Sequence, residues 1–376
     1  MDNVVSPRVY DIIKEVVDED IEKFSISVHE ANKKGEGYLG QMCFVSLRNR
    51  NNGKTFNLVI KEAFADEVIR INAPIRNVFL NEINFYTKVW PCFQNFKNKT
   101  PSIDFDKIPK CFATISDEGN EKIVLENIKY QNFEIYDKTK AFEREHIEFI
   151  FTQYGKFHAL SFAYRAFYPE RYSDLSKELT DIYSEFTERK PFRDSLEYIL
   201  DFCSKSLQPG EDDEVIQKYK HYVENCIDKF YNSNNYTGDY SVIIHGDCWS
   251  NNMMFKYDLV WGASKKVLDD LDYYLKVYHN SLSETLNEFG CNAEELYPFA
   301  ELKKDWKHHC QLGFTMGLLL WRVKLTSEED VLDLTDFKEE FDTNTSDLYF
   351  NIKYDEATYK ERSRNLILHM YENDFL

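Results

Sequence analysis

The sequence lacks several features that mark whole classes of protein. Lysines and arginines number 46 against 65 aspartates and glutamates, which gives a formal net charge of −19. A chain this acidic repels the phosphates of nucleic acids and the surface of anionic membranes, so neither is expected as a partner. No stretch approaches the roughly 18 consecutive apolar residues of a transmembrane helix.

Closely spaced cysteine pairs are also missing. The eight cysteines are scattered and none belongs to a Cys-x-x-Cys motif, so the sequence predicts neither a zinc site nor a disulfide framework. The first residues, MDNVVSPRVYDIIKEVVDED, do not place a basic segment before an apolar core, as a secretory signal would. With the scattered cysteines, this favours a cytoplasmic protein.

What the chain does have is enough apolar material for a large interior. It is 376 residues long, with 43% hydrophobic and 16% aromatic residues, and this length fits two lobes or two domains. No internal repeat or low-complexity linker divides it.

The pattern of apolar residues predicts an α+β fold with its strands near the N-terminus. An amphipathic helix and a strand fall within residues 8–30, and residues 37–62 form two apolar runs around Asn52-Gly53, a strong hairpin signal. A helix at 75–90 and a strand at 122–128 complete a β-rich lobe, 1–128. The remainder, 129–376, is predicted to be mostly helical, with helices at 143–165, 174–188, 191–205, 213–232, 265–288, 299–323 and 353–371.

The stretch SVIIHGDCWSNNMMFKYD, residues 241–258, carries the most informative cluster of polar residues. The apolar run 242–244 predicts a short buried strand, followed by His245, Asp247 and Asn252. An aspartate and an asparagine five residues apart suit phosphoryl transfer, which needs a proton acceptor and a side-chain oxygen for Mg²⁺. The alternative is a polar loop of Asx-turn residues. A metal site that begins at His-x-Asp is disfavoured, because no second ligand follows at suitable spacing.

Two residues of the N-terminal part could act with this loop. A nucleotide kinase needs a cation for the phosphates and an acid that holds the cation. Lys61 ends the apolar run of NLVIKEAF, and Glu82 lies in the helix that follows, beside its apolar stripe. A strand-end lysine and a solvated helix glutamate are the ordinary alternatives.

The backbone offers further candidates for nucleotide binding. Gly37 and Gly40 precede the first run of the hairpin and could let the backbone approach phosphates. Residues Glu126 to Ile128 could offer N–H and C=O groups to an adenine edge. A hairpin turn is strongly favoured over a P-loop at Gly53-Lys54-Thr55, because Arg48 stands where the P-loop motif requires a glycine.

In this order, the motifs KKGEGYLGQM, LVIKEAF, FLNEINFYTKVWPCF, IVLENIKYQNF, YGKFHALSFAY and IIHGDCWSNNMMFKYD resemble the ecdysteroid kinase-like family of arthropods, also called CHK kinase-like proteins. The family is related to choline and aminoglycoside kinases.

The resemblance implies a two-lobed protein-kinase-like fold that binds ATP and Mg²⁺. It also implies phosphoryl transfer to a hydroxyl of a lipophilic small molecule such as an ecdysteroid. By position, Asp247 is similar to the catalytic base, with His245 bracing its loop, and Asn252 is similar to a Mg²⁺ ligand. Lys61 and Glu82 are similar to the phosphate-binding ion pair, and His158 would be structural.

The chain departs from this family after Asn252. The family's second metal ligand is the aspartate of an Asp-Phe-Gln segment after a short strand, and no such tripeptide follows Asn252 here. Asp269 is a poor substitute, because apolar residues at helical spacing place it on the polar side of a helix. Mg²⁺ would be held poorly by one neutral amide. The alternative function is therefore a catalytically inactive nucleotide- or lipid-binding pseudokinase, or a truncated isoform that has lost part of the C-terminal lobe.

Overall fold

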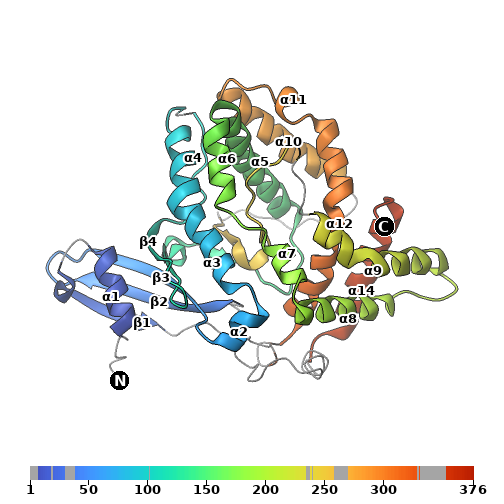
Figure 1. Cartoon of the computed structure of the whole chain (residues 1–376), viewed down its shortest axis with the longest axis horizontal. Helices are drawn as coiled ribbons and strands as arrows, with labels where there is room; N and C mark the ends of the chain where they lie inside the picture. The colour runs from blue at the N-terminus through green and yellow to red at the C-terminus, as the bar shows by residue number, and fades with distance from the viewer. Residues whose placement is uncertain are drawn as a thin grey trace.

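The computed structural model has an antiparallel sheet in its N-terminal part and a larger helical part beside it (Figure 1). The structure describes residues 7–17, 20–29, 39–100, 102–233, 238, 240–257, 270–327, 330 and 353–376. The predicted α+β fold is confirmed. The division at residue 128 falls at a short 3₁₀ helix, η3 (Ile128–Gln131), and stays a prediction as a lobe boundary.

The N-terminal sheet has five antiparallel strands in the order β1-β2-β3-β5-β4. The predicted hairpin joins β2 to β3, and Gly53 at its turn has a φ of 73°, which glycine adopts without strain. Helix α1 (Pro7–Val16) packs its buried isoleucines on one face of the sheet. The strands are β1 (Phe24–His29), β2 (Gly40–Asn49), β3 (Thr55–Ala63), β4 (Cys111–Ile115) and β5 (Lys122–Glu126).

Alternation along β3 decides which way Lys61 points. Leu58 and Ile60 are fully buried in the cluster beneath α1. Because neighbouring residues of a strand face opposite sides, Lys61 lies on the other face of the sheet. Helices α2 (Glu67–Asn72) and α3 (Ile75–Asn84) follow β3, and α3 continues through a π-helical turn (Phe85–Val89) into α4 (Trp90–Lys97).

A buried ion cluster fixes α2 and α3 to the sheet. The Glu121 side chain, just before β5, has 0% of its surface exposed. Arg70 of α2 and Arg76 of α3 bind its carboxylate at 2.7 and 2.9 Å. A carboxylate buried this deeply is tolerated because two guanidinium groups neutralise and hydrogen-bond it.

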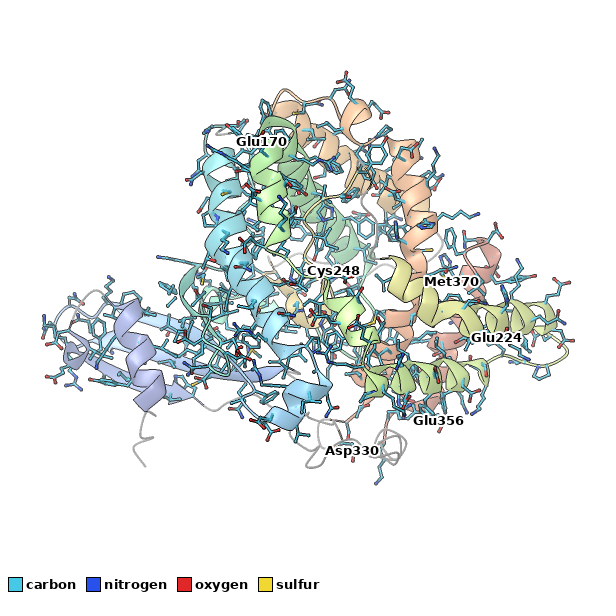
Figure 2. All side chains as sticks on the ribbon, viewed as in Figure 1. Glu170, Glu224, Cys248, Asp330, Glu356 and Met370 are labelled. Atoms are coloured by element: carbon cyan, nitrogen blue, oxygen red, sulfur yellow. The ribbon has the colours of Figure 1, made fainter. Side chains whose placement is uncertain are left out.

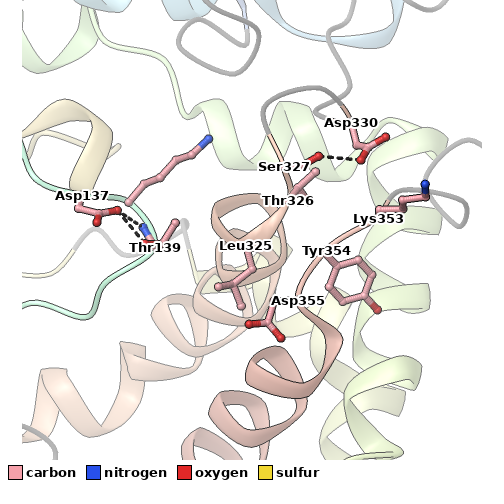
Figure 3. Close-up of a pocket in the computed structure, with 10 residues that line it drawn as sticks. Asp137, Thr139, Leu325, Thr326, Ser327, Asp330, Lys353, Tyr354 and Asp355 are labelled. Carbon is pink, nitrogen blue, oxygen red and sulfur yellow. Dashed lines mark hydrogen bonds between the residues drawn. The ribbon is translucent and has the colours of Figure 1, made fainter.

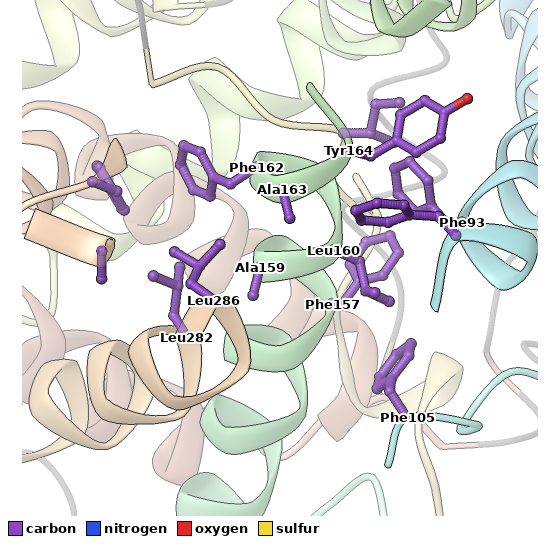
Figure 4. Packing of buried hydrophobic residues seen from close by; sticks show 14 of the residues in the cluster. Phe93, Phe105, Phe157, Ala159, Leu160, Phe162, Ala163, Tyr164, Leu282 and Leu286 are labelled. Carbon is purple, nitrogen blue, oxygen red and sulfur yellow. The ribbon is translucent and has the colours of Figure 1, made fainter. Parts of the chain in front are cut away.

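The helical part is built around α5 (Arg144–Phe167) and α10 (Leu271–Glu288). Ala159 of α5 lies beside Leu282 and Leu286 of α10, and Leu160 lies with Phe93 of α4 on the other side of α5, in one buried cluster (Figure 4). The other helices are α6 (Pro169–Lys177), α7 (Ile182–Thr187), α8 (Lys190–Ser204), α9 (Asp213–Ser233), α11 (Ala293–Leu296), α12 (Phe299–Leu325) and α14 (Glu356–Glu372). None of the helices in the described part of the chain is long and apolar enough to cross a membrane.

Two of the predicted elements are wrong. The helix predicted at 174–188 is two helices, α6 and α7, and Asp181 caps the second by accepting hydrogen bonds from the backbone of Tyr183 and Ser184. Residues 242–244 do not form a strand. The Ile243 N–H donates to the Ser161 hydroxyl of α5 instead of to a neighbouring strand, and Ile244 is 59% exposed.

The sequence analysis also did not predict β4, α2, α11, the extension of the helix beyond Trp90 as α4, or the small second sheet of β6 (Glu134–Ile135) and β7 (Met254–Phe255). The helix predicted at 265–288 corresponds to α10, which begins at Leu271, and its first residues, 265–269, lie outside the described residues.

Candidate functional site

The structure brings Lys61 and Glu82 together. The Lys61 ammonium lies 2.5 Å from Glu82 Oε2, and the two side chains are 32% and 29% exposed. Strand β3 supplies the lysine and α3 the glutamate, so the pair joins the sheet to the helix that packs on its open face. Partial exposure leaves room for the lysine to bind a ligand while the carboxylate holds it.

Asp247 and Asn252 also lie in contact, in an exposed loop. The Asn252 amide donates to the Asp247 carboxylate at 2.6 Å and to its backbone carbonyl at 2.9 Å. The Asp247 N–H donates to Nδ1 of His245 at 3.2 Å. Gly246, with a φ of 81°, allows the sharp bend between them. The loop therefore presents an acid and an amide oxygen as one rigid unit, and the short 3₁₀ helix η4 (Ser250–Asn252) closes it.

The electrostatics of His245 connect this loop with the lysine–glutamate pair. Packing of protein around the ring lowers the pKa of His245, although part of the side chain remains exposed. The charges of Asp247 and Glu82 oppose this shift in the pKa, and the charge of Lys61 reinforces it. The Lys61–Glu82 pair therefore lies near enough to His245 for its charges to affect the pKa of the ring, which places the pair in the neighbourhood of the loop that carries Asp247.

Two tyrosines that the sequence analysis did not single out support the loop. The Tyr183 hydroxyl of α7 donates to the Gly246 carbonyl at 2.6 Å. Tyr154 of α5 hydrogen-bonds Cys248, which Figure 2 labels in the middle of the molecule. Burial, with smaller contributions from Asp247 and Cys248, raises the pKa of both tyrosines, so both hydroxyls remain protonated. Nothing in the local sequence pattern distinguishes these tyrosines from the other aromatic residues of α5 and α7.

The remaining site predictions have mixed outcomes. A Cβ on Gly40 would lie 2.3 Å from the Glu62 carbonyl oxygen, so close backbone packing alone already requires glycine there. Gly37 lies outside the described residues. The Glu126 N–H donates to the Lys110 carbonyl at 2.8 Å and is not open to adenine. Ile128 begins η3, and no carbonyl of that helix can accept its N–H.

The oxygen donors fit Mg²⁺ incompletely. Asp247 and Asn252 offer one carboxylate and one amide, whereas Mg²⁺ is usually held by carboxylates together with phosphate oxygens. No group of three or more His, Cys, Asp or Glu side chains that could hold a metal occurs among the residues that the structure describes. Asp269 lies outside them. Lys61, by contrast, suits the phosphates of a nucleotide.

A separate cavity of about 570 Å³ contains none of the predicted site residues (Figure 3). It lies between the Asp137–Thr139 turn, the end of α12 and the segment before α14. Undescribed residues, 328–329 and 331–352, adjoin its lining in the sequence, so the cavity carries no assignment of function.

Comparison with known proteins agrees with the resemblance. Residues 34–260 match the ecdysteroid kinase-like family, a range that includes Lys61, Glu82, Asp247 and Asn252 and ends just after Asp258. No curated protein and no solved structure gave a significant match. The matched range covers more than half of the sequence, and the chain belongs to the ecdysteroid kinase-like family.

Proposed function

We propose that the chain binds ATP between the sheet and the Asp247 loop and acts as a small-molecule kinase. The acceptor is a hydroxyl of a lipophilic alcohol such as an ecdysteroid. The observation that carries this proposal is the Lys61–Glu82 ion pair, 2.5 Å long, whose charges lie near enough to His245 of the Asp247 loop to affect its pKa. The membership of the chain in a kinase-like family supports it.

Each group has a role that its chemistry suits. Lys61 binds phosphate oxygens, and Glu82 holds its ammonium in place. Asp247 accepts the proton of the acceptor hydroxyl, and its exposure leaves it accessible. Asn252 orients Asp247 through the 2.6 Å hydrogen bond, and His245 accepts the Asp247 N–H. We assign the adenine edge to the backbone at Ile128, because the Glu126 N–H is already bound to Lys110. Gly37 and Gly40 stay sequence predictions for the approach of the backbone to the phosphates.

A second candidate is a pseudokinase that binds a nucleotide or lipid without turnover. The observation that favours it is the absence of an Asp-Phe-Gln tripeptide anywhere after Asn252. In a kinase, Mg²⁺ bridges the phosphates and neutralises developing charge. Without a second carboxylate, ATP affinity would depend little on Mg²⁺ and transfer would be slow or absent.

Calorimetric titration with ATP, with and without Mg²⁺, tests nucleotide binding. Lys61→Met should weaken ATP binding about 10- to 100-fold, because a hydrogen bond to a charged group is worth about 1.5–3 kcal/mol. Lys54→Met, in the exposed β2–β3 turn, is the matched control and should bind like the unaltered protein. Equal affinity of the Lys61 variant and the control would refute the assignment of the ATP site.

Turnover separates the two candidates. The protein is incubated with ATP, Mg²⁺ and a panel of steroid alcohols, and phosphorylated products are measured by mass spectrometry. Product that disappears in Asp247→Asn supports the kinase. ATP binding without product in either protein supports the pseudokinase.

A further inference from the structure

Helix α3, which carries Glu82, is attached to the helical part through three asparagines on one of its faces. Asn77, Asn81 and Asn84 follow the spacing that places side chains on one side of a helix. Asn81 makes two reciprocal bonds with the backbone of Thr180, donating to its carbonyl and accepting its N–H, each at 2.8 Å. These two bonds fix the position of α3 along its axis relative to Thr180.

The other two asparagines extend this contact along α3. Asn84 donates to the Glu178 carbonyl at 2.8 Å, and Asn77 donates to the Glu185 carboxylate at 2.6 Å. Lys88, in the π-helical turn, reaches the Glu178 carboxylate at 2.8 Å. Their partners all lie between residues 178 and 185, in the break between α6 and α7 and in α7 itself.

The same stretch makes an apolar contact with the N-terminal part. Phe186 of α7 packs against the cluster that contains Ile69 of α2 and Phe79 of α3. Arg189 Nε donates to the Ile71 carbonyl at 3.3 Å. Residues 178–189, the bridging segment, therefore contact both helices that follow β3.

The bridging segment also reaches the catalytic loop. The Tyr183 hydroxyl donates to the Gly246 carbonyl at 2.6 Å, one residue before Asp247. In Figure 1, α7 lies in the centre of the view between α3 and the helices α8 and α9. One short segment thus holds the residue next to Asp247 at the same time as the residue next to Glu82.

We propose that the bridging segment sets the position of the Lys61–Glu82 pair relative to Asp247, with Asn81 and Tyr183 as its positioning residues. Any slide of α3 would break the reciprocal Asn81–Thr180 bonds and shift Glu82 with the helix. Any shift of the Asp247 loop would break the hydrogen bond between the Tyr183 hydroxyl and the Gly246 carbonyl, or displace the bridging segment with the loop. The mechanical coupling between α3 and the Asp247 loop follows from the contacts alone. Its importance for phosphate binding rests on the proposed function.

Hydrogen–deuterium exchange on the full chain measures the coupling without requiring activity. Asn81→Ala removes both hydrogen bonds with Thr180. It should speed exchange about 2- to 10-fold in the loop 241–255, although no hydrogen bond joins Asn81 to that loop. Tyr183→Phe, which removes only a hydroxyl, should speed exchange in α3. If both contacts act through the same segment, the double variant should speed exchange by less than the product of the fold-increases measured for Asn81→Ala and Tyr183→Phe.

The control is Asn72→Ala, since Asn72 donates to the Val68 carbonyl within α2. It should change exchange only around α2. Asn81→Asp keeps the acceptor for the Thr180 N–H and should partly restore the protection of the loop. Changes confined to α3 for Asn81→Ala, or to α7 and the loop for Tyr183→Phe, would overturn the proposal.

ATP titration of the same variants distinguishes the two proposals. If ATP binds, Asn81→Ala should weaken it several-fold and Asn81→Asp should partly restore it, while Asn72→Ala should not change it. If the unaltered protein does not bind ATP, the proposed function fails, and the exchange data alone decide whether the bridging segment couples α3 to the loop.

Discussion

The contact between α5 and α10 leaves no room for a side chain at Gly155, which makes Gly155→Ala a sharp test of the fold. A Cβ at this position would lie 2.6 Å from the Tyr278 carbonyl oxygen. It would also lie 3.0 Å from Ser281 Cβ and 3.1 Å from the Leu282 nitrogen. Two of these three neighbours are backbone atoms of α10, which cannot rotate away as a flexible side chain could.

Opposing effects set the size of the destabilisation. Alanine favours a helix over glycine by about 1 kcal/mol. Overpacking a well-filled core costs about 1–3 kcal/mol, and contacts with backbone place this site toward the upper end. We therefore expect Gly155→Ala to lower the free energy of unfolding by about 1–2 kcal/mol.

Gly313→Ala in α12 is the matched control. No atom lies within 4 Å of a Cβ built at Gly313, so only the gain in helix propensity remains. This variant should match the unaltered protein or exceed its stability by up to about 1 kcal/mol. Urea unfolding followed by circular dichroism measures both variants. If Gly155→Ala proves as stable as Gly313→Ala, the close approach of α5 and α10 is wrong.

The same substitution should also disturb the candidate site. Helix α5 carries Tyr154, which hydrogen-bonds Cys248, and Ser161, which accepts the Ile243 N–H. Both contacts flank the Asp247 loop. A displacement of α5 should therefore speed hydrogen exchange in residues 241–255 in Gly155→Ala, and leave it unchanged in Gly313→Ala.

Two further predictions concern buried charge. Burial lowers the pKa of His158 from 6.5 to about 4. Between pH 6.5 and pH 4, this histidine is therefore protonated in the unfolded chain and neutral in the folded protein. Stability should fall by up to about 3 kcal/mol as the pH drops from about 6.5 to 4, and urea midpoints of His158→Gln should depend less on pH. Burial would raise the pKa of Glu121, but its hydrogen bonds with Arg70 and Arg76 outweigh burial and lower it. Glu121→Gln should therefore cost about 2 kcal/mol or more in urea unfolding, because it leaves Arg70 and Arg76 without this charged partner. Glu118→Gln, at an exposed position three residues earlier, should cost less than about 0.5 kcal/mol.

Local periodicity is enough to give the direction of the side chains around Lys61. Alternation in β3 buries Leu58 and Ile60, which sends Lys61 to the opposite face whatever packs there. Helical spacing in α3 buries Phe79 and Ile83, so Glu82 must lie at the edge of the apolar stripe that meets the sheet. Of these directions, the sequence analysis predicted that of Glu82, which depends only on the spacing within one helix, while the roles of Lys61 and Glu82 stay predictions.

Features that depend on a distant partner could not be predicted in this way. The pairing of Asn81 with Thr180 spans 99 residues, and that of Tyr183 with Gly246 spans 63. Asparagines on a helix face usually meet solvent, and a tyrosine in an amphipathic helix usually packs in a core. The break between α6 and α7 was missed for the same reason, because the apolar spacing continues across it and only Asp181 marks the new N-terminus.

The failed strand at 242–244 and the missing metal ligand are connected by the same stretch of sequence. Val242, Ile243 and Ile244 have the composition of a buried strand, but a strand needs a neighbour that accepts its backbone hydrogen bonds. In this family a short strand ending in Asp-Phe-Gln is expected soon after the catalytic loop, and this sequence has none there. Such a strand would supply a carboxylate for Mg²⁺ and an adjacent element at once. Residues 258–269, where such a strand is expected, lie outside the described residues. Ile243 donates its N–H to the Ser161 hydroxyl of α5 instead of to a strand, and Ile244 is 59% exposed beside a loop whose acid and amide are in contact.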